Sequence, residues 1–494
     1  MNLLLSRIRQ NWPLLFILLL SAFLRLFRLI DYTEFLGDQA RDLIIIRNFL
    51  HSGDLFFIGP QTSIGNMYLG PFFYYLISPA LLLSSYHPIG PAAFIAILGV
   101  ATVYLVYLVT KTFFDKSSAL VAALLYALSP VVIKYSTFSW NPNIMPFFSL
   151  LFIFSIYNFV STKSPKYLLW ASLSLILCLN SHYLALLLIP PAAFFLGLFF
   201  YRQRHHLGTL PSMLVLPAIL LLLSLLPQIL FDFKHDGQNV KAIIQFFCYR
   251  ETTVNIKPYK AIPHLIPLFN QYTARLISGK NDNAGILFSA FILVGLFVYY
   301  FKTRQQNIPF KSRLLFLTAF LFFGIFGLSL YKQHIYDHYF GIIFPLGFIV
   351  FAFLVTRLLT SKLKFFAYLL ILSAALFSLW ENPFRYAPNR QVQTTQAIVD
   401  SIINDSQNQP FNLALLAKQN YDDTYRYFFF LADAPLKDAH SKITDQLYVI
   451  CEPWQIECQP INHPQWQIAS FGWAKIDKQW VINGITVFRL IHTQ

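Results

Sequence analysis

Charged residues are scarce in this chain. Lys, Arg, Asp and Glu make up 12% of its 494 residues, whereas hydrophobic residues make up 56%. In soluble globular domains, about a quarter of all residues are charged. The low charge content and a mean hydropathy of +0.54 exclude an ordinary soluble enzyme or binding domain. They indicate a polytopic membrane protein, in which long apolar helices cross the bilayer.

The short motifs of nucleotide and zinc chemistry are also missing. The sequence has no Walker loop, no dinucleotide-binding glycine fingerprint and no zinc-ligand spacing. It contains only four cysteines, of which Cys451 and Cys458 lie close together in the polar C-terminal tail. If the tail is extracytoplasmic, this spacing fits either a disulfide or two free thiols.

The net charge of +15 does not indicate a nucleic-acid partner, because the basic residues lie mainly in short loops between apolar segments. They gather in alternate loops, near residues 7–9, 111–116, 163–166, 202–204, 302–313 and 357–364. By the positive-inside rule these loops are cytoplasmic. We therefore expect a multi-pass protein of the cell (plasma or inner) membrane, with a cytoplasmic N-terminus and an extracytoplasmic tail.

The fold class expected from this pattern is an all-α membrane domain of about 11 transmembrane helices over residues 1–380, followed by a small C-terminal extracytoplasmic α/β domain over 381–494. The first span is read as a retained signal anchor. The expected spans are 12–30, 92–110, 117–133, 144–160, 167–180, 183–201, 210–231, 285–301, 314–331, 339–356 and 365–380. Two large outer loops result, at 31–91 and 232–284, and the apolar piece 72–83 is expected to be a surface or re-entrant helix.

The tail has the alternating pattern of a small domain. Its polar and apolar residues predict helices at 393–403 and 421–431 and strands at 412–417, 446–451 and 485–491. About 110 residues are enough for such a domain to have its own core.

Acidic residues in the membrane part lie almost entirely on the outer side. Up to residue 380, only Asp115 falls in an expected cytoplasmic loop. In the first outer loop, Asp38, Arg41 and Asp42 project to one side if a helix begins near Gly37. Asp38 then lies at the positive N-terminal end of that helix and suits a proton-accepting role. The structural alternative is a helix cap paired with Arg41.

The surrounding residues resemble the first outer loop of polyprenyl-phosphate-sugar glycosyltransferases of the C-type membrane fold (GT-C). This branch includes protein O-mannosyltransferases and the lipid A aminoarabinose transferase, and is glycosyltransferase family 39-like. The matching residues are Asp38, Gln39, Arg41, Ser52, Gly53, Asp54, Tyr68 and Pro71. The resemblance implies that Asp38 is the catalytic aspartate. Two positions depart from it: Gln39 replaces a second acid, and Gly70 replaces a lysine of the aminoarabinose-transferase-like members.

A lipid-phosphate donor needs cations on the outer face. Our candidates for donor or substrate binding, beside Arg41, Asp42 and Tyr68, are Lys234, His235, His338 and Tyr339; the last two lie where relatives place a basic, tyrosine-bearing motif. Further basic candidates are Arg250, Arg275, Lys280, Lys332 and His334. Alternatively, His338 and Tyr339 belong to an interfacial aromatic belt. No cofactor is required by these motifs; a divalent metal is left open, with Asp38, His334 and Asp337 as weak ligand candidates.

The function expected from this resemblance is transfer of a sugar from a polyprenyl-phosphate donor to a lipid, glycan or protein acceptor, with inversion and with Asp38 as general base. A flippase or transporter of lipid-linked saccharides is a rival, but it predicts ionisable residues at mid-membrane, which the spans offer hardly at all. A polysaccharide polymerase or ligase that uses diphosphate-linked glycans is a second rival. A catalytically inactive relative that serves as a scaffold is a third.

Overall fold

The computed structural model describes residues 2–62, 67–204, 210–249, 253–255, 257–304, 309–452 and 458–493. The candidate cation Arg250 lies outside these residues. The chain divides into two compact units. Unit 1 contains residues 1–27, 55–77 and 93–387, and unit 2 contains 28–54, 78–92 and 388–494. We describe each unit by itself.

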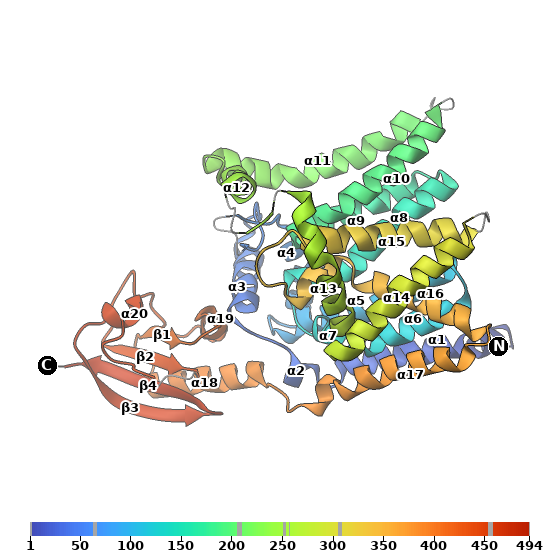
Figure 1. Cartoon of the computed structure of the whole chain (residues 1–494). Coiled ribbons are helices and arrows are strands. Elements are labelled where there is room, and N and C mark those ends of the chain that lie inside the picture. Colours follow the sequence, from blue (N-terminus) through green and yellow to red (C-terminus); the bar gives the residue numbers. More distant parts are fainter. Residues whose placement is uncertain are drawn as a thin grey trace. The chain divides into compact units, whose positions relative to one another are not determined.

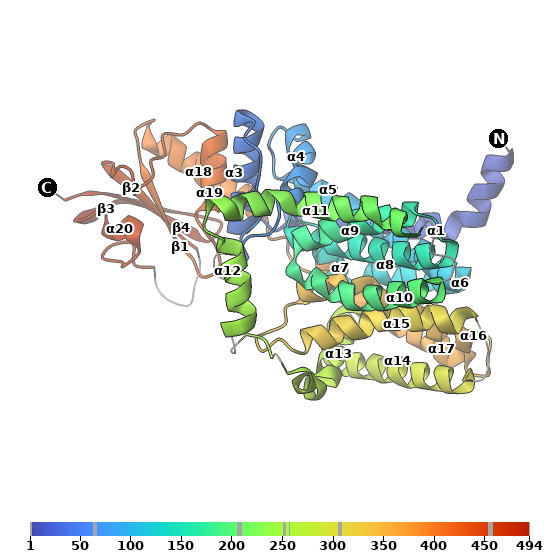
Figure 2. The same cartoon turned by 90° about the horizontal axis from the view of Figure 1, so that it is seen from above.

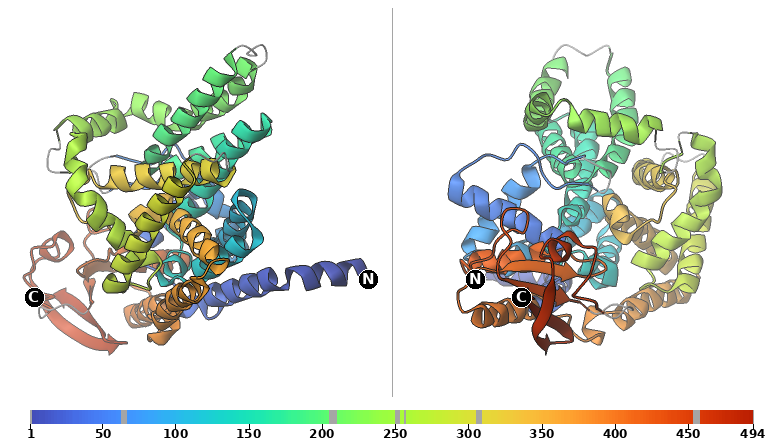
Figure 3. Two further views of the ribbon diagram at one scale, coloured as in Figure 1. Left: turned by 45° about the vertical axis from the view of Figure 1, so that its right-hand side comes forward. Right: turned by 90° about the vertical axis from the view of Figure 1, so that its left-hand side faces the viewer.

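Unit 1 is a bundle of long apolar helices (Figure 1). Figure 2 shows α8, α9 and α10 running side by side, and Figure 3 shows α1 as one long helix that leads to the N-terminus. Its main helices are α1 (Asn2–Leu26), α5 (Ile89–Phe113), α6 (Lys116–Leu128), α8 (Met145–Thr162), α9 (Lys166–Ser181), α10 (Ile189–Arg202), α11 (Leu210–Lys234), α14 (Asp282–Lys302), α15 (Pro309–Leu328), α16 (Phe344–Leu359) and α17 (Lys364–Trp380).

These helices match the eleven expected spans one for one. Within the described residues, six helical segments are long and apolar enough to cross a membrane, and six shorter apolar helices accompany them. One shorter helix is α4 (Phe72–Leu83), which lies where a surface or re-entrant helix was expected. Several boundaries differ. Helix α6 ends at Leu128 and not at residue 133, and α10 begins at Ile189 because residues 183–188 form the 3₁₀ helix η2. Helix α16 begins at Phe344, not at residue 339, because residues 337–342 form the 3₁₀ helix η6 (Asp337–Ile342).

Helix α16 shows how the bundle is held together. Thirteen of its residues are buried, from Phe344 to Thr356 without a break. A helix that is apolar all round belongs inside a bundle, and α16 packs against α6, α14, α15 and α17. In contrast, the most apolar window of α11 is only 11% buried, so most of its surface is left for lipid.

Shorter elements lie between the long helices of unit 1. They are α7 (Pro130–Lys134), η1 (Asn141–Ile144), η2 (Tyr183–Leu188), α12 (Gln238–Ile244), the π-helical η4 (Gln245–Tyr249), η5 (Pro258–Ala261), α13 (Ile262–Leu276) and η7 (Pro383–Arg385). Most of them belong to the loops that were assigned to the outer face, where the candidate binding residues are found.

Unit 2 combines part of the first outer loop with the C-terminal tail. Its elements are α2 (Leu29–Tyr32), α3 (Gly37–Ser52), α18 (Gln391–Ser406), β1 (Asn412–Leu416), α19 (Asp423–Leu431), β2 (Gln446–Cys451), α20 (Trp466–Ala469), β3 (Ala474–Ile482) and β4 (Ile485–His492). The strands form one sheet in the order β1-β2-β4-β3 (red arrows in Figure 3). Strands β1 and β2 are parallel; the other pairs are antiparallel.

All the predicted tail elements are present, but the short helix α20 and the strand β3 were not predicted. This strand was missed because most of its residues are exposed and four of its side chains are polar or charged, which is typical of an edge strand. Strand β2, in contrast, is buried along its whole length. Cys451 and Cys458 form a disulfide, which selects one of the two alternatives that the spacing left open.

Candidate active site

Asp38 lies in the first turn of α3, as expected. The backbone N–H of Leu36 donates to Oε1 of Gln39 at 2.9 Å, so the residue that replaces a second acid serves as a cap of this helix. The N–H of Gly37 donates to Oδ1 of Asn420 at 2.9 Å. The helix ends at Gly53, whose φ of 78° is the left-handed conformation typical of a helix C-terminus.

The three charged residues of α3 differ in exposure. Arg41 donates once to Asp38, from Nη1 to Oδ1 at 3.0 Å, and twice to Oδ1 of Asp42, at 3.1 and 2.9 Å. The Asp42 side chain is 3% exposed, whereas that of Asp38 is 39% exposed. The buried Asp42 thus holds the Arg41 side chain in place, and a contact of Asp42 with substrate stays a prediction. Asp38 is the accessible carboxylate.

The C-terminal tail brings a further acid close to this group. Asp423, at the start of α19, is half-buried, and its charge interacts with those of Arg41 and Asp38. Burial, followed by the neighbouring Asp422, raises the pKa of Asp423 above its ordinary value. Neither Asp423 nor Asn420 was predicted to lie near Asp38, because nothing in their spacing along the sequence relates them to residue 38.

Tyr68 lies in unit 1, where its backbone connects its own loop to α12 and η2 through hydrogen bonds. Its N–H donates to Oδ1 of Asn239 at 2.7 Å, and its carbonyl accepts from the Tyr183 hydroxyl at 2.7 Å. Gly70, two residues on, packs so closely that a Cβ there would lie 1.8 Å from Oδ1 of Asn180. A lysine could not occupy position 70 unless Asn180 moved, which gives a physical reason for this departure.

Lys234 and His235 are exposed at the end of α11. The His235 ring stacks on Phe231 with a centroid distance of 4.1 Å. The adjacent Asp232 accepts from the N–H groups of Asn239 and Val240, at 2.8 and 3.1 Å, and so caps α12.

His338 and Tyr339 lie in η6 within an aromatic group. His338 meets Trp140 edge to face at 4.6 Å and lies 6.2 Å from His182, while His182 meets Tyr339 at 5.6 Å. Burial and the nearby His182 lower the pKa of His338 to about 3. His338 is therefore uncharged at neutral pH, and any contact that it makes with a phosphate is a hydrogen bond rather than an ion pair.

Two residues that we had considered separately form a pair. Nε and Nη2 of Arg275 donate to Oδ1 and Oδ2 of Asp337, each at 2.6 Å. This hydrogen bond to Asp337 raises the pKa of Arg275. Across the described part of the chain, no three His, Cys, Asp or Glu side chains are arranged to hold a metal ion. The described residues do not fit a metal site, and we derive no step through a metal.

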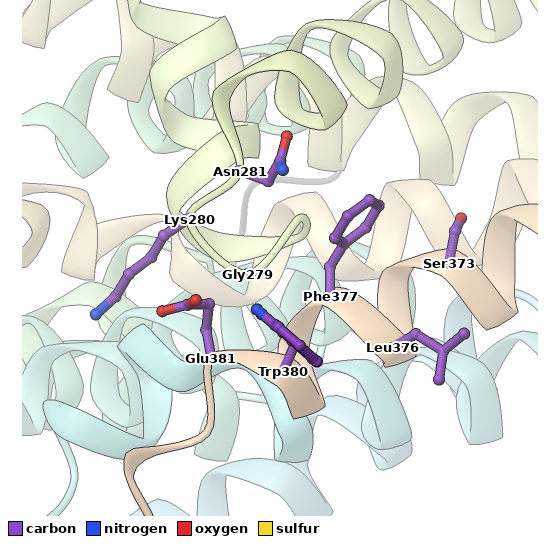
Figure 4. Close-up of a pocket in the computed structure, with 8 residues that line it drawn as sticks. All are labelled: Gly279, Lys280, Asn281, Ser373, Leu376, Phe377, Trp380 and Glu381. Carbon is purple, nitrogen blue, oxygen red and sulfur yellow. The ribbon is translucent and has the colours of Figure 1, made fainter. Parts of the chain in front are cut away.

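A pocket of about 570 Å³ opens between the α13–α14 turn and the end of α17 (Figure 4). Lys280 and Glu381 lie at one end of it and Ser373 and Leu376 at the other, with the rings of Phe377 and Trp380 between them. The turn needs Gly279, whose φ is 57° and whose missing Cβ would lie 2.2 Å from the Phe377 carbonyl oxygen.

The two charged residues of this pocket differ in their partners. Glu381 accepts from the Tyr386 hydroxyl at 2.6 Å and pairs with Arg385 at 3.4 Å. Within the residues that the structure describes, the ammonium group of Lys280 has neither a hydrogen bond nor an ion pair. Burial, followed by the charge of Arg275, lowers the pKa of Lys280. At one end of the pocket the Lys280 ammonium group thus feels the charges of Asp337 and Glu381 without a direct ion pair, and apolar side chains line the rest.

Comparisons with known proteins agree with this architecture. Residues 69–231 match the family model of dolichyl-phosphate-mannose-protein mannosyltransferases. The fold is similar to ArnT from Cupriavidus metallidurans, both bound to undecaprenyl phosphate (10% identity) and in the apo state (12%). Each match has a TM-score of 0.59 and covers 97% of this chain and 98% of ArnT.

A third similar structure is the archaeal oligosaccharyltransferase AglB from Archaeoglobus fulgidus, in complex with an inhibitory peptide and a dolichol-phosphate. The TM-score is 0.51 at 15% identity, and the match covers 87% of this chain but 64% of AglB. A search of curated proteins found no match. The chain is a multi-pass membrane protein with the GT-C glycosyltransferase fold.

Proposed function

We propose that this chain is a membrane glycosyltransferase that takes its sugar from a polyprenyl-phosphate donor and transfers it to an extracytoplasmic acceptor. The observation that carries the proposal is the accessible Asp38 carboxylate at the N-terminus of α3, in a chain whose whole length follows the fold of ArnT. In the described part of the chain, only Oδ1 of Asp38 accepts a hydrogen bond, so Oδ2 is available to a substrate.

In the proposed reaction, Asp38 takes the proton from an acceptor hydroxyl or amine. The acceptor oxygen or nitrogen forms a bond to the anomeric carbon, and the bond from that carbon to the phosphate oxygen breaks. The polyprenyl phosphate leaves with its electron pair, and the anomeric configuration inverts. Phosphate is already a good leaving group, so the protein mainly has to orient the reactants and compensate their negative charge. Arg41, beside Asp38, supplies positive charge for this purpose.

We further propose that the pocket at Lys280 holds the phosphate of the lipid. An ammonium group without a partner attracts a phosphate, while Leu376, Phe377 and Trp380 offer an apolar surface to the lipid chain. Tryptophan at the end of a span is typical of the membrane interface. The remaining predictions for substrate binding are Asp42, Tyr68, Lys234, His235, His338 and Tyr339.

For the topology, we propose a cytoplasmic N-terminus and an extracytoplasmic tail. The basic loops support this orientation, and so does the Cys451–Cys458 disulfide, since disulfides persist in oxidising compartments. Single cysteines placed at Lys302 and at Lys437 test it with an impermeant thiol reagent. Labelling at Lys437 and not at Lys302 is expected in intact cells, and the reverse result would overturn the topology.

The function is tested by incubating the purified protein in lipid nanodiscs with a panel of polyprenyl-monophosphate and polyprenyl-diphosphate sugars. Release of polyprenyl monophosphate is expected, with a product of inverted anomeric configuration by NMR. Turnover of diphosphate-linked glycans alone would favour the polymerase or ligase. Movement of an intact lipid-linked saccharide without release of the lipid would favour the flippase, and no reaction with any donor would favour the inactive scaffold.

A further inference from the structure

The N-terminus of α3 is held by side-chain amides. Three consecutive backbone N–H groups precede and open this helix, and each donates to an amide oxygen: Phe35 to Gln391 at 2.8 Å, Leu36 to Gln39 at 2.9 Å and Gly37 to Asn420 at 2.9 Å. Gln391 and Asn420 belong to the C-terminal tail. All three acceptors are neutral, so the positive end of the helix is left to the charge of Asp38.

Asn420 occupies a defined place on the small sheet. It follows β1, and Glu452 follows β2, which is parallel to β1. The carboxyl ends of adjacent parallel strands meet at one edge, the usual place for binding groups in α/β sheets. There Nδ2 of Asn420 donates to Oε1 of Glu452 at 2.6 Å, and the Tyr425 hydroxyl donates to the same oxygen at 2.9 Å.

This pair fixes the orientation of the Asn420 amide. An ionised carboxylate only accepts hydrogen bonds, so the amide nitrogen must face Glu452 and the amide oxygen must face Gly37. The same oxygen accepts from the Thr424 hydroxyl at 2.7 Å and from the Tyr421 N–H at 2.9 Å. Asn420 therefore joins the N-terminal ends of α3 and α19, which lie side by side in Figures 1 and 2.

The docking of α3 on α19 leaves little room for movement. A Cβ on Gly37 would lie 2.4 Å from Cδ2 of Tyr421. Farther along the helix, Arg47 donates to the Phe430 carbonyl at 3.3 Å, and Phe35 packs edge to face on Phe428 at 5.6 Å. The first turn of α3 is thus seated against the tail, and Asn420 is its direct backbone contact there.

We infer that Asn420, oriented by Glu452, is a positioning residue that fixes the first turn of α3 and thereby directs the Asp38 carboxylate. This inference rests on the proposed function. Asn420 touches no substrate; it acts through the Gly37 N–H. The choice of an amide matters, because a carboxylate at position 420 would add a negative charge beside those of Asp38, Asp42 and Asp423 and oppose the ionisation of Asp38.

The kinetic test compares Asn420→Ala with Asn404→Ala, an exposed asparagine on α18. A displaced catalytic group lowers turnover more than binding, so Asn420→Ala is expected to lower kcat about tenfold while the donor KM changes less than about twofold. Asn404→Ala is expected to match the wild type. Unchanged kcat in Asn420→Ala would overturn the inference.

If Asn420→Ala does not fold, a second test exchanges the amide of Asn420 and the carboxylate of Glu452. Asn420→Asp alone sets two carboxylates against each other, whereas Asn420→Asp with Glu452→Gln restores one donor and one acceptor in reversed order. The double variant is expected to recover most of the kcat lost by the single variant, with the acid limb of its pH–rate profile moved to higher pH. A double variant no more active than Asn420→Asp would contradict the inference.

Amide hydrogen exchange of residues 35–41 separates this inference from the proposed function, because it needs no substrate. Faster exchange by about tenfold is expected in Asn420→Ala and none in Asn404→Ala. If the wild type turns over no donor, the proposed function fails, and hydrogen exchange alone decides whether Asn420 fixes the first turn of α3. Unchanged exchange in Asn420→Ala would refute that role whatever the activity.

Discussion

Several aspartates pair with arginines in the described residues, and two of these pairs, one in each unit, differ in how many carboxylate oxygens the arginine engages. In unit 1, both oxygens of Asp337 accept from Arg275 at 2.6 Å, and the Asp337 side chain is 14% exposed. In unit 2, Asp38 accepts one hydrogen bond from Arg41 at 3.0 Å and is 39% exposed. Arg41 also donates two hydrogen bonds to the buried Asp42.

The difference separates a structural pair from a chemical one. A carboxylate that accepts from one guanidinium with both oxygens is held in a fixed orientation, and the adjacent cation favours its charged form, so it takes up a proton less readily. A carboxylate with one free oxygen, at a helix N-terminus and open to solvent, can accept a proton from a substrate. Under the proposed function, Asp337 therefore stabilises the fold and Asp38 acts as the general base. The substitutions below test these two roles.

The largest effect on stability is expected from Asp337→Asn. It leaves Arg275 without its charge partner, and we expect a loss of about 2 kcal/mol, below the usual cost of breaking a buried pair because Arg275 is 33% exposed. Thermal unfolding measures it. Arg275→Gln with Asp337→Asn should recover part of the loss. Unchanged stability in Asp337→Asn would contradict a structural role of the Arg275–Asp337 pair.

Lys280→Ala tests a cation of unit 1 that has no partner. Since no ion pair is broken, we expect no loss of stability, but a donor KM raised about tenfold, because a hydrogen bond between charged groups contributes about 1.5–3 kcal/mol. Lys260→Ala, an exposed lysine of η5, is the control and should behave as the wild type. An unchanged KM would exclude the pocket as the site of the donor phosphate.

The smallest effect is expected from Asp423→Asn beside the Asp38 pair. Burial raises the pKa of Asp423 above 3.8, so the folded protein holds this proton more tightly than the unfolded chain does. Stability is therefore lost as the pH rises through that raised pKa. At neutral pH the substitution should raise the unfolding temperature by about 2 °C.

Below pH 3.8 the carboxyl is protonated in both states, and the gain from Asp423→Asn should vanish. The exposed Asp400 on α18 gives the matched control, and Asp400→Asn should leave the unfolding temperature unchanged at both pH values. A gain that persists in acid would show that charge is not its cause.

Much of the fold could be predicted because apolar runs and turn residues are local signals. Every expected span corresponds to a helix, and α3 begins at Gly37 as predicted. The start of α16 was placed too early because residues 339–343 (Tyr, Phe, Gly, Ile and Ile) are apolar and continue the hydrophobic run. Strand β3 was missed because an exposed edge strand need not alternate between apolar and polar residues.

The site could be predicted only where its residues are close in sequence. Asp38 and Arg41 are three positions apart on one helix, and their contact follows from helix geometry. Arg275 and Asp337 are separated by 62 residues, and Gly37 and Asn420 by 383, so only tertiary packing brings them together. The proximity of Asn420 and Glu452 could have been predicted. The strand–helix–strand order at 412–451 predicts two parallel strands, and the residues that follow such strands lie at the same edge of the sheet.

The most direct test of the central claim measures donor binding and donor turnover of Asp38→Asn beside Asp400→Asn. If Asp38 is the general base, Asp38→Asn should bind the polyprenyl-phosphate sugar as tightly as the wild type and release polyprenyl phosphate about 10³-fold more slowly. Asp400→Asn should match the wild type in both respects. Equal turnover by Asp38→Asn and the wild type would contradict the account.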